Sequence, residues 1–208
     1  MNSPSEFSSL PRQPAASRAI DPFIVMDVMR EANRRQAAGE DIIHMEVGQP
    51  ATPAPRAARD RVVRAMAEHN LGYTLSLGLP ELRERIAGYL KSRYSVDVGP
   101  ERIVVTAGSS AGFVLAFLAI LNHGDSFGLP SPGYPCYRQI LKALGFQPRL
   151  IATSDEGRWM PTRADVDALA AKGASGLLLA SPNNPTGTMA PGTRLKELAE
   201  ACTRQGLW

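Results

Sequence analysis

Two adjacent asparagines, Asn183 and Asn184, have the chemistry to hold a polar ligand in this chain of 208 residues. Each side-chain amide offers an acceptor and two donors without a charge, so a rigidly held pair can orient a polar ring. The apolar run 177–180 before them is typical of a buried parallel strand. Pro182 and Pro185 interrupt this run and fix the pair at its carboxyl end, where open α/β sheets bind ligands. A simple Asn-Pro turn that only ends the strand is the alternative.

A second candidate site lies where the β-branched segment 103–105, which suits a buried strand, leads into a helix predicted over 111–121. Gly108 permits a tight turn, and Ser109 can cap the helix. The first N–H groups of a helix and its dipole attract anions, so this turn, with Ser110, could hold a phosphate. A capped helix without a ligand is the alternative. Because the helix is apolar on all sides, we expect it to be buried against a sheet.

Three further residues lie in loops beside predicted elements. Tyr134 follows a strand predicted over 126–129, and its flat face could stack on a heteroaromatic ring or pack as an ordinary core aromatic. Tyr73 precedes a predicted helix, and simple packing is again the alternative. Gly48 follows a short strand predicted over 42–47, where a glycine permits either close approach to a ligand or a turn.

The elements that must position these residues alternate between strands and helices. One more strand is predicted over 149–152, and helices are predicted over 21–38, 55–69, 80–90, 140–144, 165–172 and 195–204. Asp21 is expected to cap the first helix, with Pro22 in its first turn. This alternation predicts an α/β fold with a doubly wound, mostly parallel sheet and flanking helices.

Composition excludes several classes of protein. The 23 Lys and Arg residues against 20 Asp and Glu leave a net charge of +3, too small and dispersed to indicate binding of nucleic acid or a membrane surface. Cys136 and Cys202 have no metal-ligand spacing, so no disulfide, metal site or cysteine nucleophile is expected. With so few cysteines, we expect a cytoplasmic location. Residues 1–17 are rich in Ser and Pro and are expected to form a disordered extension. They lack the apolar core of a secretory signal.

Three motifs, taken together, resemble the signature of the class I/II aminotransferases, which use pyridoxal phosphate and have fold type I. They are S-P-N-N-P-T-G at 181–187, Y-x-x-x-x-G-x-P-x-L-R at 73–83 and S-P-G-Y at 131–134. The resemblance covers about residues 20–208 but only the amino-terminal half of a family member. It implies an incomplete cofactor-binding large domain over 48–208, an amino-terminal helical segment of the small domain over 18–47, and a homodimer.

The resemblance also assigns individual residues to pyridoxal phosphate or to the substrate. Those expected to contact the cofactor are Gly108, Ser109, Ser110, Tyr134, Asn184 and Tyr73, the last reaching across the dimer. Those expected to contact the substrate are Gly48 and Asn184. The family's Schiff-base lysine, the aspartate beside the pyridine nitrogen and the arginine that binds the substrate carboxylate have no matching positions here, so no catalytic residue is assigned.

The resemblance implies transfer of an amino group between an amino acid and a 2-oxo acid. The 208-residue chain is expected to be a fragment that is inactive alone, because the lysine is both covalent anchor and proton carrier in such enzymes. Two alternatives remain: a pyridoxal-phosphate-dependent lyase of the same fold, and a non-catalytic remnant that binds the cofactor or a phosphate. The sequence does not select one amino acid as substrate.

Overall fold

A computed structural model describes residues 20–208, so the extension expected over 1–17 lies outside the described residues. The described chain forms two compact units. One contains residues 20–22 and 110–208, and the other contains residues 23–109. The division expected from the sequence, at residues 47 and 48, stays a prediction.

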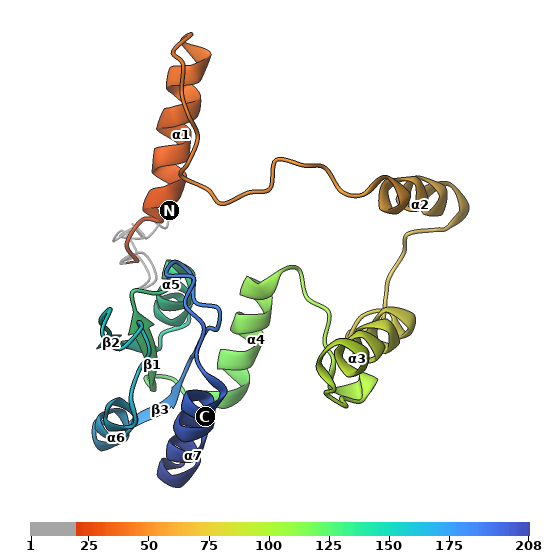
Figure 1. The fold of residues 1–208 in the computed structure, drawn as a ribbon. Helices are drawn as coiled ribbons and strands as arrows, with labels where there is room; N and C mark the ends of the chain where they lie inside the picture. The colour runs from red at the N-terminus through yellow and green to blue at the C-terminus, as the bar shows by residue number, and fades with distance from the viewer. Residues whose placement is uncertain (1–19) are drawn as a thin grey trace, which may run out of the picture. The chain divides into compact units, whose positions relative to one another are not determined.

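The unit of residues 110–208 is built on a three-stranded parallel sheet (Figure 1). Its elements in chain order are α4 (Ser109–Ile120), β1 (Ser126–Ser131), α5 (Pro135–Ala143), β2 (Gln147–Ala152), α6 (Arg163–Ala171), β3 (Ala174–Leu177) and α7 (Gly192–Gln205). The strand order is β2-β1-β3, with Ser126 of β1 opposite Gln147 of β2 and Ala174 of β3. The strands predicted over 126–129 and 149–152 are therefore confirmed.

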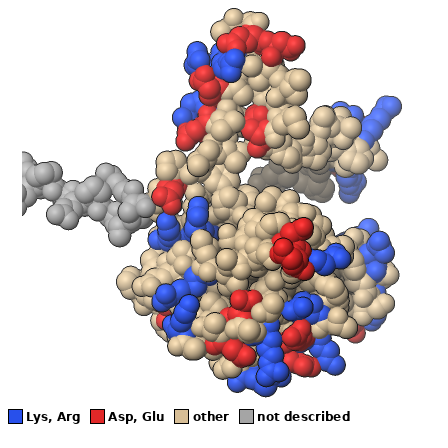
Figure 2. Space-filling model, turned by 60° about the vertical axis from the view of Figure 1, so that its left-hand side comes forward, with Lys and Arg blue, Asp and Glu red and all other residues tan. Residues whose placement is uncertain are grey.

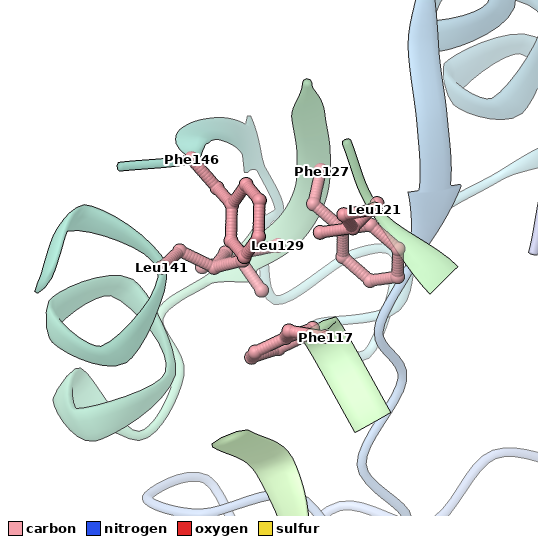
Figure 3. Close-up of a cluster of buried hydrophobic side chains, with 6 residues drawn as sticks. All are labelled: Phe117, Leu121, Phe127, Leu129, Leu141 and Phe146. Carbon is pink, nitrogen blue, oxygen red and sulfur yellow. The ribbon is translucent and has the colours of Figure 1, made fainter. Parts of the chain in front are cut away.

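Helices cover both faces of this sheet. Phe127 and Leu129 of β1 pack with Phe117 of α4 and Leu141 of α5 in one core cluster, which Leu121 and Phe146 complete (Figure 3). On the other face, α6 and α7 pack together through Val166, Leu198 and Ala201. The predicted doubly wound arrangement is confirmed, and strand alternation explains it, because residues two apart on β1 point to the same face.

The strand before the asparagine pair lies earlier than predicted. The expected strand covers 177–180, whereas β3 ends at Leu177. Leu178 still donates its N–H to the carbonyl of Gly128 at 3.0 Å, so one ladder bond continues past the strand. On the other side of β3, the backbone of Trp208 donates to Ser175 at 3.0 Å and accepts from Leu177 at 2.9 Å, which is the slanted pattern of a parallel pair.

α4 is buried on one face only. Phe117 is 2% exposed, but Leu115 and Leu118 are 53% and 56% exposed. An all-apolar helix presents side chains in every direction, and the described residues of its unit cover only the face that meets the sheet. The prediction that this helix packs against the sheet is therefore confirmed, although its other sides stay exposed in the described chain.

The unit of residues 23–109 is helical. It contains α1 (Ile24–Ala37), α2 (Arg56–Glu68), α3 (Pro80–Tyr94) and the 3₁₀ helix η2 (Pro100–Arg102). Pro80 occupies the first turn of α3, as its fixed φ favours. Arg83 of α3 donates from Nε to the carbonyls of Pro100 and Ile103, both at 3.0 Å, and so holds the segment after α3 against the helix.

Two predicted strands and one predicted helix cap are wrong. Residues 42–47 and 103–105 are not strands, because β-branched residues form a strand only where a partner supplies ladder bonds. Val105 makes one such bond, to the carbonyl of Leu77 at 3.0 Å. Asp21 does not cap α1, which begins after Phe23 without a side-chain cap; its carboxylate instead meets Lys142 Nζ at 3.0 Å. This contact lowers the pKa of Asp21.

Replacing Gly176 of β3 with alanine is expected to lower the free energy of unfolding by about 1–3 kcal/mol. A Cβ at this position would clash with the ring of Phe127 and lie 2.7 Å from the backbone oxygen of Trp208. Relieving the second clash would require the backbone to shift, which costs free energy. Gly192→Ala is the matched control, since nothing lies within 4 Å of its Cβ and the change should stabilise by up to about 1 kcal/mol. Urea unfolding of both variants measures the difference, and equal midpoints would contradict the described packing.

Candidate functional site

The structure gives the two asparagines different environments. Asn183 is 8% exposed, and its Nδ2 donates to Thr186 Oγ1 at 2.9 Å and to the carbonyl of Pro132 at 3.3 Å. The backbone carbonyl of Asn183 accepts a hydrogen bond from the N–H of Gly187 at 2.8 Å. Asn184, by contrast, is exposed. Asn183 therefore organises the loop, and Asn184 is the amide presented to solvent, a distinction that their identical side chains do not reveal in the sequence.

The bond from Asn183 to Pro132 joins two loops at the carboxyl edge of the sheet. One loop follows β3, and the other follows β1. Thr153, just after β2, adds a bond from its Oγ1 to the carbonyl of Ser131 at 2.9 Å. The peptide bonds before Pro132, Pro182 and Pro185 are cis. The loops that carry Tyr134 and Asn184 are thus fastened to each other at the edge where α/β sheets bind ligands.

Tyr134 lies between the end of β1 and the start of α5, and it is the N-cap residue of that helix. Its ring meets the ring of Tyr137 edge to face, at 5.4 Å between centroids and 80° between planes. Tyr137 also packs on Phe113 at 4.7 Å, so of the two tyrosines it is the one engaged in core packing. Burial, followed by the neighbouring thiol of Cys136, raises the pKa of Tyr134, so its hydroxyl keeps its proton at neutral pH.

The turn predicted to hold a phosphate has the expected local form. Gly108 has a φ of +83°, a conformation open to glycine, and its carbonyl accepts a bond from Thr106 Oγ1 at 2.8 Å. Ser109 and Ser110 are the first two residues of α4, and both are exposed. The N–H groups of a first helical turn have no partner within the helix, so this turn has donors for an anion.

Ser110, the second residue of α4, contacts the helix that follows the loop of Tyr134. Its Oγ lies 3.7 Å from the Sγ of Cys136, and Cys136 in turn interacts with Tyr134. The described unit of residues 110–208 therefore brings together Ser110, Tyr134 and, through the Asn183–Pro132 bond, the loop of Asn184. Gly48 and Tyr73 belong to the other unit, where both are exposed, and their assigned roles stay predictions.

Arg138 of α5 is a polar residue that the sequence did not indicate. It lines a cavity of about 100 Å³ together with Tyr134 and Asn183, and its Nε is buried. Arg138 lies one turn after Tyr134 on the helix that begins at the loop, and this position could have indicated it. An arginine on an amphipathic helix usually faces solvent, however, so the position alone did not distinguish it.

The surface of the described chain carries both signs of charge. On the face drawn in Figure 2, Lys and Arg are interspersed with Asp and Glu among wide areas of other residues. No helix among residues 20–208 combines the length and the apolarity that crossing a bilayer requires.

A parallel sheet with helices on both faces and polar loops at its carboxyl edge defines an α/β fold of the kind in which ligands bind at that edge. Comparison with known proteins then identifies the family. Residues 40–208 match the family model described as aminotransferase class I and II. The chain belongs to this family, as its three motifs predicted.

Individual relatives support the same assignment. The chain is 42% identical over 191 residues to the valine–pyruvate aminotransferase of Mycobacterium tuberculosis, covering 90% of this chain and 48% of that protein. It is 32% identical over 199 residues to a probable aspartate/prephenate aminotransferase of Aquifex aeolicus, covering 95% and 50%. The crystal structure of an aminotransferase from M. tuberculosis superposes with a TM-score of 0.89 at 39% identity, covering 94% and 50%. The chain spans about half the length of the relatives it matches.

Proposed function

We propose that the full-length protein transfers an amino group between an amino acid and a 2-oxo acid, with pyridoxal phosphate as its cofactor. The observation that carries this proposal lies within the unit of residues 110–208, where the Asn183–Pro132 bond joins the loops after β1 and β3 and the Ser110–Cys136 contact adds the start of α4. Amino-group transfer agrees with the activity named for the aminotransferase relatives of the chain. The expected cytoplasmic location and the homodimer belong to the same proposal.

The residues proposed to hold pyridoxal phosphate fit it by their chemistry. The first turn of α4, with Gly108, Ser109 and Ser110, offers N–H and hydroxyl donors suited to a phosphate. Tyr134 offers an aromatic face and a protonated hydroxyl, and Asn184 offers an uncharged amide. When bound, the cofactor supplies the electron sink for chemistry at the amino acid's α carbon.

The roles of these residues in the reaction are to bind and orient. Donors on a helix N-terminus hold an anion without changing their own protonation, so the turn before α4 would act as a fixed anchor. The loop that carries Asn184 is itself held by the buried Asn183, which would keep the Asn184 amide in one position through the reaction. Gly48 is proposed to contact the substrate. Tyr73 is proposed to contact the cofactor that the partner subunit of the dimer binds.

We infer that valine and pyruvate are the substrate pair to test first, because the relative that is 42% identical is a valine–pyruvate aminotransferase. Aspartate is the competing amino donor, since the Aquifex relative, at 32% identity, is a probable aspartate/prephenate aminotransferase. Higher identity over a similar length favours the first pair.

The test uses the full-length protein with added pyridoxal phosphate. Incubated with valine and pyruvate, it is expected to form alanine and the 2-oxo acid of valine in equal amounts, measured by chromatography of both products. Aspartate in place of valine is expected to react at least about tenfold more slowly in kcat/KM. Release of ammonia without a new amino acid would favour the lyase, and cofactor binding without any turnover would favour the non-catalytic remnant; either result would overturn the proposal.

A further inference from the structure

The motif Y-x-x-x-x-G-x-P-x-L-R at 73–83 contains two residues to which the proposed function gives no role. They are Gly78, just before α3, and Arg83, in the first turn of that helix. The structure brings both against one segment, residues 100–105, which leads along the chain into the turn proposed to hold the phosphate. All of these residues belong to the unit of residues 23–109.

Arg83 holds the beginning of this segment through its partly buried guanidinium. Its Nε donates to the backbone carbonyls of Pro100 and Ile103, both at 3.0 Å, and its Nη2 donates to that of Pro100 at 2.6 Å. Hydrogen bonds from a charged donor are stronger than those between neutral groups. All three end on backbone oxygens, so Arg83 fixes the path of the chain rather than the position of another side chain.

Gly78 fixes the end of the same segment. The N–H of Val105 donates to the carbonyl of Leu77, the residue before Gly78, at 3.0 Å. A Cβ on Gly78 would lie 2.7 Å from both Cβ and Cγ2 of Val105. Gly78 also has a φ of +96°, which side chains rarely allow. A glycine at this position therefore permits the close approach of the two segments.

The turn itself continues this series of contacts. Thr106 Oγ1 donates to the carbonyl of Gly108 at 2.8 Å, and the N–H of Gly108 donates to the carbonyl of Thr106 at 2.8 Å. Hydrogen bonds thus hold the backbone at intervals from Pro100 to Gly108, immediately before Ser109 begins α4.

We propose that Arg83 and Gly78 are positioning residues for the phosphate-binding turn. They fix the path of residues 100–108, and with it the donors at the start of α4, before the cofactor binds. A site that is already ordered loses less conformational entropy when its ligand arrives, so this arrangement strengthens binding of the phosphate. The inference rests on the proposed function, because it requires a phosphate at that turn.

The experiment compares two forms of the cofactor in the full-length protein from which cofactor has been removed. Pyridoxal phosphate and pyridoxal differ only in the phosphate, so the ratio of their Kd values, measured by equilibrium dialysis, reports on the turn. Arg83→Met removes all three hydrogen bonds to the segment and should raise the Kd of pyridoxal phosphate at least about tenfold. The Kd of pyridoxal should change less than about threefold, whereas a general loss of structure would weaken both forms alike.

Arg85→Met is the matched control. Arg85 is an exposed residue of the same helix, and none of the hydrogen bonds to residues 100–105 comes from it. The Kd ratio should therefore stay within about twofold of the wild-type ratio. Arg83→Lys keeps the charge but loses the fork of donors, so its ratio should lie between those of Arg83→Met and the wild type.

Gly78→Ala approaches the same segment by a different route. It leaves Arg83 in place but forces Val105 to move away from the new Cβ. Its Kd for pyridoxal phosphate should rise more than its Kd for pyridoxal, as in Arg83→Met. Agreement between the two variants would show that the effect passes through residues 100–105.

Hydrogen–deuterium exchange of the wild type keeps the inference testable if the variants do not fold. In the cofactor-free protein, the amide of Val105 should already exchange slowly, because its N–H is bonded to Leu77. The amide of Ser109, in the first turn of α4, should exchange quickly and become slow when pyridoxal phosphate is added.

Two results would overturn the inference and leave the proposed function intact. A Kd ratio that Arg83→Met does not change, whether both values rise or neither does, would mean that Arg83 contributes only to stability. Fast exchange at Val105 that slows only with cofactor would mean that the ligand, and not the motif, orders the segment. Absence of pyridoxal phosphate binding by the wild type would instead overturn both the proposed function and this inference.

Discussion

Replacing Leu141 with alanine is expected to lower the free energy of unfolding by about 2–5 kcal/mol. Leu141 is 0% exposed and lies between α5 and β1, in contact with the cluster that contains Phe127 and Leu129 (Figure 3). Truncation removes buried apolar surface and leaves a cavity that close-packed neighbours fill only in part. The loss should appear as a lower midpoint in urea unfolding of the full-length protein.

Leu195→Ala is the control for this substitution. Leu195 lies on α7 and is 39% exposed, so the same chemical change should cost less than about 1 kcal/mol. Similar losses for the two leucines would mean that the cluster of β1, α4 and α5 is not the core of this unit. A loss at Leu195 exceeding that at Leu141 would indicate the same.

Asn184→Ala and Asn183→Ala are expected to separate function from stability. In the full-length protein, Asn184→Ala should lower kcat/KM for amino transfer by about 10- to 100-fold, the worth of one hydrogen bond to a charged or strongly polar ligand. Its thermal stability should not change, because the side chain is exposed. Asn183→Ala should instead lower the free energy of unfolding by about 1–3 kcal/mol, since it removes the bonds to Thr186 and Pro132.

Steady-state kinetics and thermal unfolding of the two variants check this pair. The decisive comparison is the stability of Asn183→Ala against the stability of Asn184→Ala. If Asn184→Ala is the less stable variant and keeps full activity, the roles given to the two amides are exchanged, and the proposed contact of Asn184 with cofactor and substrate is wrong.

Much of the fold was predictable from the sequence because local patterns specify helices. α2, α3 and α7 begin within a few residues of the predicted positions. The strands were predicted less well, since a strand also needs a neighbour to bond. Segment 103–105 is β-branched yet is not a strand, and β3 lies before most of the apolar run that predicted it.

The candidate site shows the same limit. The motif 181–187 predicted a ligand loop at a sheet edge. A tight turn was predicted at Gly108, and the structure gives this glycine a positive φ. Which asparagine is buried depends on Pro132, which is 51 residues away along the chain. The cavity beside Arg138 depends on three loops meeting, so no local pattern could have revealed it.

The parallel register of the sheet has a consequence for how this unit folds. Along the chain, only α5 separates Ser126 from its partner Gln147. Its other partner, Ala174, comes only after α5, β2 and α6. Contacts between distant segments require loops to close before the contacts stabilise them, which slows folding. We therefore expect β1, α5 and β2 to associate first and β3 to dock later. During that interval the apolar β1 edge is unpaired, and this is the period in which aggregation would compete with folding.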